Sequence, residues 1–353
     1  MNILHVITSL RTGGAEHLMV DLLPRLRDLG NNVELLLFDG TRTSFYEQLE
    51  SNGIKIHSLG VGGNVYNPLN IFKLAKYIHK YDIVHTHNTA CQLFAPFAKV
   101  HCSCKTKIIT TEHNTTNRRR DKWYLKPIDK WMYGKYNAII CISDSTAYNL
   151  MNHIGQNDKI VTINNGICVS SFIRPPKKLI KENIKKIIMV AAFREQKDHD
   201  TLLRAISELP EDYYLYLVGD GVRRNTVESL CHQLELNNRV SFLGVRNDIP
   251  DLYEDADVAV LSSHWEGFGL SAVEAMASGT PTIASDVPGL SEVVSDYGVL
   301  FPQGDHRALA SAIRKLCDDS HYYSEVAKRC QTRAKEFDIS IMTQKYNELY
   351  YSL

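Results

Sequence analysis

Residues 257–274 read DVAVLSSHWEGFGLSAVE, and they indicate the fold more clearly than any other part of this 353-residue chain. The apolar run at 258–261 is typical of a buried strand, and residues 271–277 are typical of a helix. Glycines just before a helix let its free N–H groups approach a ligand closely, and the helix dipole adds to their attraction for anions. The stretch therefore predicts a strand–loop–helix unit with a diphosphate site at the helix start.

Two glutamates flank this predicted site. Glu266 lies in the loop before the helix, and Glu274 lies about one turn inside it. Carboxylates are poor phosphate ligands, but they accept hydrogen bonds well from sugar hydroxyls. An ordinary helix start with an acidic first turn explains the same residues equally well, so both readings stay open on the residues alone.

Strand and helix patterns alternate through both halves of the chain, which predicts parallel sheets covered on both faces. In the first half we expect a helix at 16–29 and strands at 3–9, 33–38, 54–59, 83–86, 107–111, 138–143 and 159–163. After a proline- and lysine-rich break at 174–178, we expect strands at 187–192, 214–218, 240–243, 258–261 and 282–284, and helices at 198–209, 224–234, 271–277 and 307–317.

This pattern predicts an α/β protein with two Rossmann-like, doubly wound domains and an interdomain cleft faced by the carboxyl ends of the strands. The expected domains are residues 1–170 and 185–335, followed by a closing helix within 336–353 that packs back toward the first domain. The first half is basic, because residues 1–168 hold 19 Lys and Arg against 13 Asp and Glu, while the rest hold 21 against 27. Such asymmetry indicates either an anionic partner for the first half or packing between the halves.

Composition argues against several other classes of protein. No run of eighteen apolar residues is present, and the start of the chain is typical of a first strand rather than a signal peptide. The eight cysteines include no Cys-X-X-Cys pair, and Cys102-Ser103-Cys104 beside His101 lacks a second cluster to complete a metal site. We therefore expect free thiols, no metal and a cytoplasmic location.

Residues 266–274, with seven residues between two glutamates and Gly-Phe-Gly inside, resemble the signature of glycosyltransferase family 4. The resemblance continues through EAMASGTP at 274–281 and SDVPGLSEVV at 285–294. It implies the GT-B fold and a retaining, metal-independent glycosyltransferase that uses a nucleotide diphosphate sugar as co-substrate. Here we expect a UDP-sugar in preference to a GDP-sugar, no separate cofactor, and a glycan or lipid-linked acceptor.

The resemblance also implies the donor-binding residues. Arg194 and Lys197 match the basic pair that binds the donor diphosphate, although Phe193 stands where the family commonly has glycine, which leaves the geometry of that turn in question. Both cations could stabilise the charge of the leaving group. Glu266 would hold the sugar and Glu274 the ribose. The other implied donor contacts are Gly13, Gly14, Gly219, Val245, Phe268, Gly269, Leu270 and Ser271.

In the first domain, His113 matches a position where the family carries an active-site histidine, and Asn114, which follows it, is an expected acceptor or membrane contact. We expect catalytic roles for His113, Glu266, Arg194 and Lys197. Glu16 is an acceptor-side candidate, although a role at the helix dipole explains it slightly better. His85 and His87 are expected to point to opposite faces of their strand, which disfavours joint metal binding.

The segment 118–135 is basic and aromatic, and it contains the expected acceptor or membrane residues Arg118, Arg119 and Arg120. Three explanations stay open: an anionic membrane surface with a lipid diphosphate acceptor, single-stranded nucleic acid, or a solvated helix whose aromatics join the core. The expected partners are the nucleotide sugar, the acceptor and an anionic membrane surface at the inner face of the membrane, and no nucleic acid is expected. A sugar-nucleotide epimerase and a non-catalytic nucleotide-sugar-binding scaffold are the alternative functions.

Overall fold

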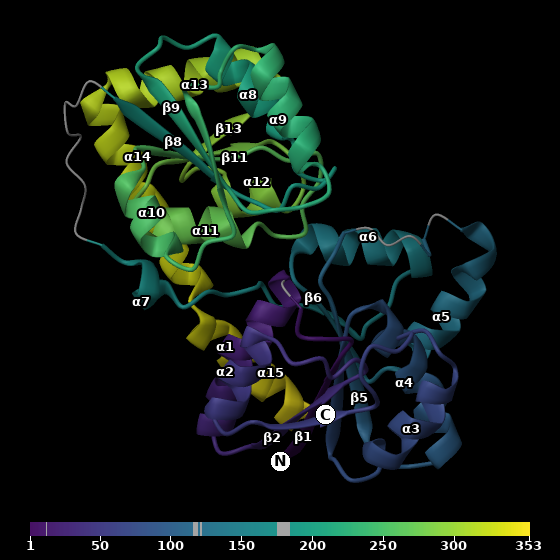
Figure 1. The fold of residues 1–353 in the computed structure, drawn as a ribbon. Coiled ribbons are helices and arrows are strands. Elements are labelled where there is room, and N and C mark those ends of the chain that lie inside the picture. Colours follow the sequence, from purple (N-terminus) through teal and green to yellow (C-terminus); the bar gives the residue numbers. More distant parts are fainter. Residues whose placement is uncertain (12, 116–118, 121, 175–183) are drawn as a thin grey trace. The chain divides into compact units, whose positions relative to one another are not determined.

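The computed structural model describes residues 1–11, 13–115, 119–120, 122–174 and 184–353. This part of the chain forms two compact units (Figure 1). The first unit comprises Met1–Gly166 and Ile339–Leu353, and the second comprises Ile167–Asp338. Arg118 and residues 175–178 of the expected linker lie outside the described residues.

The first unit is built on a seven-stranded sheet in the order β3-β2-β1-β4-β5-β6-β7, and all of its strand pairs are parallel. Its strands are β1 (Asn2–Ile7), β2 (Asn32–Leu37), β3 (Lys55–Ser58), β4 (Ile83–His87), β5 (Lys107–Glu112), β6 (Ala138–Cys141) and β7 (Ile160–Thr162). Its helices are α1 (Gly14–Asp28), α2 (Ser44–Ser51), α3 (Leu69–Ile78), α4 (Thr89–Cys102), η1 (Trp123–Leu125), α5 (Lys126–Lys135), α6 (Asp144–Ile154) and α15 (Ile339–Ser352).

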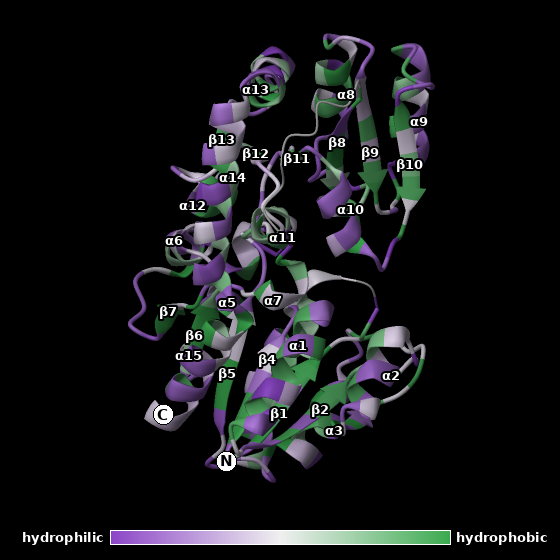
Figure 2. Ribbon diagram, turned by 90° about the vertical axis from the view of Figure 1, so that its left-hand side faces the viewer, coloured by the Kyte–Doolittle hydropathy of each residue, from purple (hydrophilic) through white to green (hydrophobic). Residues whose placement is uncertain are grey.

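The second unit has a six-stranded parallel sheet in the order β10-β9-β8-β11-β12-β13. Its strands are β8 (Lys185–Val190), β9 (Tyr213–Val218), β10 (Val240–Gly244), β11 (Val258–Leu261), β12 (Thr282–Ser285) and β13 (Val299–Phe301). Its helices are α7 (Val169–Phe172), α8 (His199–Ser207), α9 (Arg224–Gln233), α10 (Ile249–Asp255), α11 (Leu270–Ala277), α12 (Leu290–Val294), α13 (His306–Asp318), α14 (Ser320–Ala334) and η2 (Lys335–Phe337). In Figure 2, β9 and β10 are mostly green, because apolar residues predominate in both strands.

Both sheets reverse their strand order at one place. In the first unit the order changes between β1 and β4, and in the second it changes between β8 and β11. Loops that leave neighbouring strands at such a point run to opposite sides and leave a crevice at the carboxyl ends of the strands, which is where α/β proteins bind their ligands. The topology therefore directs attention to the loops after β1, β4, β8 and β11.

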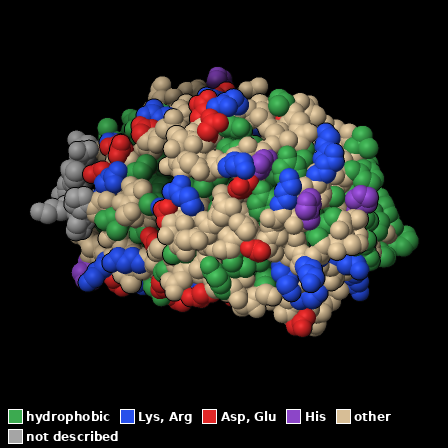
Figure 3. Space-filling model, turned by 90° about the horizontal axis from the view of Figure 1, so that it is seen from below, with side chains coloured by type: hydrophobic (Ala, Val, Ile, Leu, Met, Phe, Trp, Pro, Cys, Tyr) green, Lys and Arg blue, Asp and Glu red, His purple; other side chains and the backbone are tan. Residues whose placement is uncertain are grey.

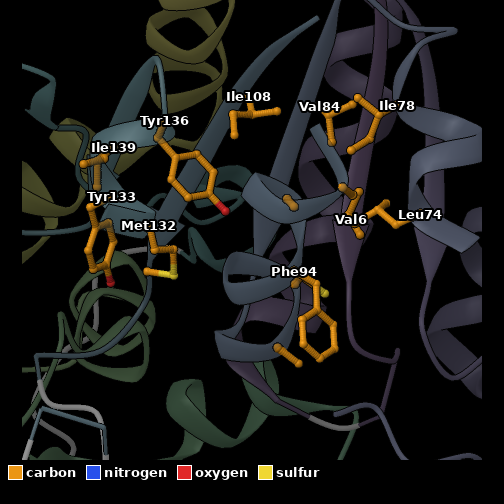
Figure 4. Packing of buried hydrophobic residues seen from close by; sticks show 14 of the residues in the cluster. Val6, Leu74, Ile78, Val84, Phe94, Ile108, Met132, Tyr133, Tyr136 and Ile139 are labelled. Atoms are coloured by element: carbon orange, nitrogen blue, oxygen red, sulfur yellow. The ribbon is translucent and has the colours of Figure 1, made fainter. Parts of the chain in front are cut away.

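One face of the first sheet carries a continuous apolar core. Alternate residues of β1, β4, β5 and β6 point to this face and pack against α3, α4 and α5 (Figure 4). The labelled members are Val6, Leu74, Ile78, Val84, Phe94, Ile108, Met132, Tyr133, Tyr136 and Ile139, and nearly all of them are fully buried. This core supplies the main apolar burial on that side of the sheet.

The opposite face of the first sheet is more polar. His5, His85 and Thr111 point to it from β1, β4 and β5, and all three are fully buried. Helix α15 comes from the end of the chain, packs against α1, and places Tyr346 and Tyr350 on this face, also fully buried. The C-terminal helix thus completes the first unit by covering imidazole and hydroxyl groups.

The structure contains several elements that the sequence patterns did not predict: α10, α12, β13 and α14. Helix α14 buries only Tyr323, Val326, Cys330 and Ala334, so its apolar stripe is narrow and its periodicity is weak. None of the helices in the described residues combines the length and the apolar character needed to cross a membrane. All eight cysteines are free thiols.

The buried histidines predict that acid destabilises the first unit. Burial lowers the pKa of His5 to about 3 and that of His113 to about 4, and it holds the pKa values of His85 and His87 well below the ordinary value. Between pH 6.5 and 4 the unfolded chain therefore binds more protons than the folded chain. The stability that these neutral rings contribute is fully present above pH 6.5 and is lost as the pH falls, by roughly 2 kcal/mol at pH 5 for His5, whose folded-state pKa is about 3.

Urea denaturation at pH 7.5 and pH 5 measures this loss. In a Trp265→Phe background, fluorescence reports the first unit through Trp123 and Trp131, the two remaining tryptophans. His5→Gln should reduce the acid-induced loss by the share of one histidine, whereas His232→Gln, which replaces an exposed histidine, should not change it. Equal acid sensitivity in the two variants would contradict the prediction.

Candidate functional site

In the second unit, the loops that follow β8 and β11 are joined through their backbones. Lys197 and Ser263 form an antiparallel bridge, and the N–H of His264 donates to the carbonyl of Gln196 at 2.9 Å. The N–H of Asp198 donates to the carbonyl of Ser262 at 3.1 Å. Two loops that leave the sheet at the change of strand order are thus held as one structure.

This joint places Lys197 against Glu266. The two side chains form an ion pair and are largely buried, with 14% and 13% of their areas exposed. Glu266 Oε1 also accepts a hydrogen bond from Gln196 Nε2 at 3.3 Å and one from the backbone N–H of Gly267 at 3.1 Å. The carboxylate is therefore held in a defined orientation by three groups from the two loops.

Arg194 lies on the same loop as Lys197, but it is exposed. Within the described residues, no acidic side chain forms an ion pair with it. Phe193, the residue that departs from the family pattern, is buried and stacks on His199 with ring centroids 4.3 Å apart. The turn accommodates the phenylalanine by directing its ring into the core, and the following arginine faces solvent.

Helix α11 begins beside this pair of loops. Gly269 is its N-cap with φ of +96°, and no side chain caps this end. A Cβ at Gly269 would lie 2.5 Å from Leu290 Cδ2, so the close approach requires glycine. The N–H groups of the first turn, at Leu270 and Ser271, are those that an α-helix leaves without internal partners.

The other residues expected to bind the donor differ in how far they are exposed. Phe268 is buried and meets Phe337 edge to face at 5.2 Å, so its ring belongs to the core and only its backbone is available to a ligand. Glu274 is half-buried within α11. Gly219 donates its N–H to the carbonyl of Gly244 at 2.8 Å, which joins the ends of β9 and β10, and Val245 just beyond is 66% exposed.

In the first unit, the loop after β1 leads into α1 through Gly13 and Gly14. Gly13 is the N-cap of α1 in an extended conformation, and a Cβ there would lie 2.2 Å from Glu16 Oε2. Glu16 is engaged within the unit, because its Oε1 accepts a hydrogen bond from Asn88 Nδ2 at 3.1 Å. The structure therefore supports a structural role for Glu16 and weakens the expectation that it contacts an acceptor.

Asn88 was missing from the expected site residues. It follows β4 directly, has φ of +66°, and donates from Nδ2 to Thr8 Oγ1 at 3.1 Å as well as to Glu16. It thus links the ends of β1 and β4 at the change of strand order. The sequence did contain an indication of this role, because Asn88 directly follows a strand that changes from apolar residues at 83–84 to polar residues at 85–87.

His113 follows β5 and is partly exposed, and exposed Asn114 comes next. Its Nε2 lies 3.0 Å from His87 Nδ1. Among the described residues, no group forms a hydrogen bond with His113 Nδ1. Because burial lowers the pKa of His113 to about 4, the ring is neutral at physiological pH, with one donating and one accepting nitrogen.

The expectation that His85 and His87 point to opposite faces is wrong. Residues two apart in a strand share a face, and their ring centroids lie 4.4 Å apart. His5 joins them from β1, with its Nδ1 3.0 Å from His87 Nε2. Ligand atoms of His5, His85 and His87 all lie within 4.8 Å of one another.

The structure also argues against a membrane role for two arginines of the basic segment. Arg119 pairs with buried Asp129 at 3.1 Å, and Arg120 pairs with buried Glu112 at 2.9 Å. Only 15% and 10% of their side-chain areas are exposed. Arg119 and Arg120 therefore neutralise internal carboxylates, while Arg118 lies outside the described residues.

Comparison with known proteins identifies the family of the chain and its fold. Residues 171–337 match the family model of glycosyl transferases group 1, and residues 12–171 match that of glycosyltransferase family 4. N-acetyl-α-D-glucosaminyl L-malate synthase of Bacillus anthracis is 27% identical over 286 residues, which are 77% of this chain and 75% of that protein. UDP-Gal:α-D-GlcNAc-diphosphoundecaprenol α-1,3-galactosyltransferase of Escherichia coli is 27% identical over 308 residues, which are 80% and 78%.

Among solved structures, HepE of Anabaena in complex with UDP matches with a TM-score of 0.89 and 23% identity over 100% of both chains. Complexes of HepE with UDP and glucose and with UDP-glucose match at TM-scores of 0.89 and 0.88. The fold expected from the sequence, two Rossmann-like domains of the GT-B type, is thereby confirmed. Since the two family models together span residues 12–337 and each unit carries one Rossmann-like sheet, this chain belongs to glycosyltransferase family 4.

Proposed function

We propose that the chain transfers a sugar from a UDP-sugar to a glycan or lipid-linked acceptor, with retention of anomeric configuration and without a metal ion. One observation carries the proposal: exposed Arg194 and ion-paired Lys197 lie on a loop that is hydrogen-bonded through its backbone to the loop that leads into the uncapped start of α11. Cations and free N–H groups gathered in one place suit a diphosphate.

The donor diphosphate would bind Arg194, Lys197 and the N–H groups of Leu270 and Ser271. When the glycosidic bond breaks, the leaving nucleoside diphosphate gains negative charge, and fixed donors stabilise that charge without reorganisation. The ammonium group of Lys197 has three N–H donors, so its pairing with Glu266 leaves others for phosphate. These groups could supply the stabilisation that a metal ion provides in other transferases.

Glu266 would accept hydrogen bonds from hydroxyls of the transferred sugar, and Glu274 would bind the ribose. Gly219 and Val245 would border the base. The ion pair between Glu266 and Lys197 favours a positioning role over nucleophilic attack, so we propose departure and attack on the same face, with the leaving phosphate taking the proton of the acceptor. A covalent glycosyl–Glu266 intermediate is the alternative route.

In the first unit, His113, Gly13 and Gly14 would contact the transferred sugar or the donor phosphate, and Asn114 the acceptor. The choice of UDP follows from HepE, which was solved with UDP and UDP-glucose. The galactosyltransferase of Escherichia coli, whose name specifies a diphosphoundecaprenol acceptor, supports a lipid-linked acceptor and a role in cell-surface glycan synthesis. These relatives favour neither the epimerase nor the scaffold.

Removing the cations should weaken nucleotide binding. Arg194→Gln and Lys197→Gln should each raise the Kd for UDP by roughly 10- to 100-fold, because each removes a charge-assisted hydrogen bond to phosphate. Isothermal titration calorimetry with UDP, GDP and ADP measures both the effect and the preference for the base. The matched control is Arg307→Gln, which neutralises a cation of the second unit that is 83% exposed.

An unchanged Kd for UDP in the Arg194 and Lys197 variants would remove the basis of the proposal. Tighter binding of GDP than of UDP would leave the site in place but refute the proposed base.

Glu266→Gln tests whether the site performs transfer. The amide keeps the shape but loses the negative charge, so we expect at least a 100-fold fall in kcat with UDP binding retained within a few-fold. The measurement is release of UDP from candidate UDP-sugars with and without acceptor. A scaffold would keep its cellular role in the variant, and an epimerase would convert the donor sugar with no acceptor present.

The first unit also exposes an aromatic and basic surface formed by η1 and α5, here called the η1–α5 surface. Its members are the exposed residues Lys122, Trp123, Tyr124, Lys126, Ile128, Lys130, Trp131 and Lys135. Trp123 is 84% exposed, and Trp131 lies against Phe97 of α4 with ring centroids 4.6 Å apart. In Figure 3, hydrophobic side chains with Lys and Arg among them gather toward the right of the view, the side where Figure 1 places α3, α4 and α5.

Exposed tryptophan and tyrosine beside lysines suit the interface of an anionic membrane. We therefore propose that the η1–α5 surface holds the enzyme at the cytoplasmic membrane face, where a lipid-linked acceptor would lie. The exposed lysines and aromatic residues of this surface, and not Arg119 and Arg120, would contact the membrane.

Replacing Lys126 and Lys130 by Gln should weaken partitioning into phosphatidylglycerol vesicles roughly 30-fold, because each lysine near an anionic surface contributes about 1 kcal/mol. Vesicle sedimentation measures this, and phosphatidylcholine vesicles serve as the neutral comparison. The matched control is the double variant Arg307→Gln, Lys328→Gln, which loses the same two positive charges from exposed residues of the second unit. Equal partitioning of the two double variants would argue against the η1–α5 surface.

A further inference from the structure

A continuous row of hydrogen-bonded side chains runs through the first unit and ends at His113. We call it the imidazole row, and its members in order are Tyr346, Thr111, His85, Tyr350, His5, His87 and His113. Their contacts, taken in that order, are 3.3, 2.7, 2.6, 3.4, 3.0 and 3.0 Å. The row joins β1, β4, β5 and α15.

The inner six members of the row are fully buried, and His113 alone is partly exposed. Burial lowers the pKa of all four histidines, so each ring is neutral and carries a single N–H. The ring nitrogens of His5, His85 and His87 are all engaged by a neighbour in the row.

Neutral imidazoles in such a row cannot choose their tautomers independently. A ring that donates to the next member must accept from the previous one, because it has one N–H and one lone pair. Where two histidines face each other, reversal of one tautomer would bring two protons or two lone pairs together. A hydroxyl can accept from both of its neighbours, so the direction could change within the row only at Thr111 or Tyr350, and the buried proton of that hydroxyl would then lack an acceptor in the row. Otherwise the row runs in one of two directions, toward His113 or away from it.

The buried end of the row favours the direction toward His113. In that direction the hydroxyl of Tyr346 donates to Thr111 Oγ1, Thr111 donates to His85 Nε2, and the remaining members follow. In the opposite direction Tyr346 would accept from Thr111 and would need another acceptor for its own proton. No such acceptor occurs among the hydrogen bonds of the described residues, and an unsatisfied buried hydroxyl is costly.

In the favoured direction, His87 Nδ1–H donates to His113 Nε2, so the single proton of His113 lies on Nδ1. We propose that the imidazole row locks His113 as an Nδ1–H donor, and that His87, His5 and Tyr350 are positioning residues for it. His113 would then donate a hydrogen bond to an oxygen of the sugar or the acceptor and would not serve as a general base. This inference rests on the proposed role of His113 in transfer.

A metal ion held by His5, His85 and His87 is the competing explanation for the cluster. A metal would need one lone pair from each ring, and the row uses those lone pairs to accept hydrogen bonds. The group also includes no carboxylate or thiolate among the described residues that could complete or orient a coordination shell. Neutral hydrogen bonding therefore explains the geometry more completely.

Long-range ¹H–¹⁵N correlation NMR of the ¹⁵N-histidine-labelled chain tests the lock directly, with His113→Gln to assign the resonance. We expect a single neutral tautomer of His113, protonated at Nδ1, from pH 8 to pH 5.5. Protonation at Nε2, or a mixture of tautomers, would refute the lock. Stoichiometric zinc in the purified protein that is lost in His5→Gln would also refute it.

Tyr350→Phe cuts the row while keeping the ring in place, and Tyr351→Phe, on an exposed neighbour, is the matched control. In Tyr350→Phe we expect His113 to become a mixture of tautomers and kcat to fall roughly tenfold with KM unchanged, the rate equivalent of one neutral hydrogen bond. The Tyr351 variant should match the unmodified chain in both measurements. A fall in kcat without any change in the His113 tautomer would indicate a merely structural role for Tyr350 and would overturn the proposal.

The proposed role of His113 in transfer and the proposed lock on its tautomer can be refuted separately. Full transfer by His113→Gln would remove the proposed role of His113, whatever its tautomer. A mixed tautomer in the unmodified chain, together with an inactive His113→Gln variant, would refute the lock and leave the proposed function in place.

Discussion

The backbone joint between the loops after β8 and β11 is the constraint on which the proposed donor site depends. Those loops leave neighbouring strands at the change of strand order, and the bridge between Lys197 and Ser263 holds them together. Once they are joined, the ion pair of Lys197 with Glu266 follows, and Arg194 remains exposed. Gly289 reinforces the arrangement, because a Cβ there would lie 2.4 Å from the carbonyl oxygen of Glu266. A donor site built this way has its charges in place before a ligand arrives, which is what electrostatic stabilisation of a leaving group requires.

The strand order of the first sheet also changes at one place, but different side chains lie around that point. One face of its sheet is an ordinary apolar core, whereas the other places imidazoles and hydroxyls beneath α15. These groups are satisfied by one another, with Tyr350 and Thr111 completing the partners of His85. Because hydrogen-bonded polar groups in a core define one arrangement more sharply than apolar groups do, this face is suited to orienting His113.

Several charged residues illustrate how burial changes the meaning of a sequence pattern. The basic segment reads as one cationic strip, yet Arg119 and Arg120 turn inward to Asp129 and Glu112, while Lys126 and Lys130 stay exposed. A local count of charges cannot distinguish these cases, since the carboxylates lie on other turns and strands. The same limit applies to His85 and His87: their spacing places them on one face, but only the tertiary structure supplies His5 and Tyr350 as their partners.

By itself the sequence determined the alternation of strands and helices, the strand–loop–helix unit around Glu266 and the family, because those features depend on local periodicity and on residues close together in the chain. It did not reveal β13 or α14, whose apolar patterns are short or sparse. The tertiary structure alone decided which face of the first sheet is polar, that α15 covers it, and that Lys197 pairs with Glu266. The residues that make these contacts are 69 to 345 positions apart in the sequence. Such contacts depend on strand order and register, which no local pattern encodes.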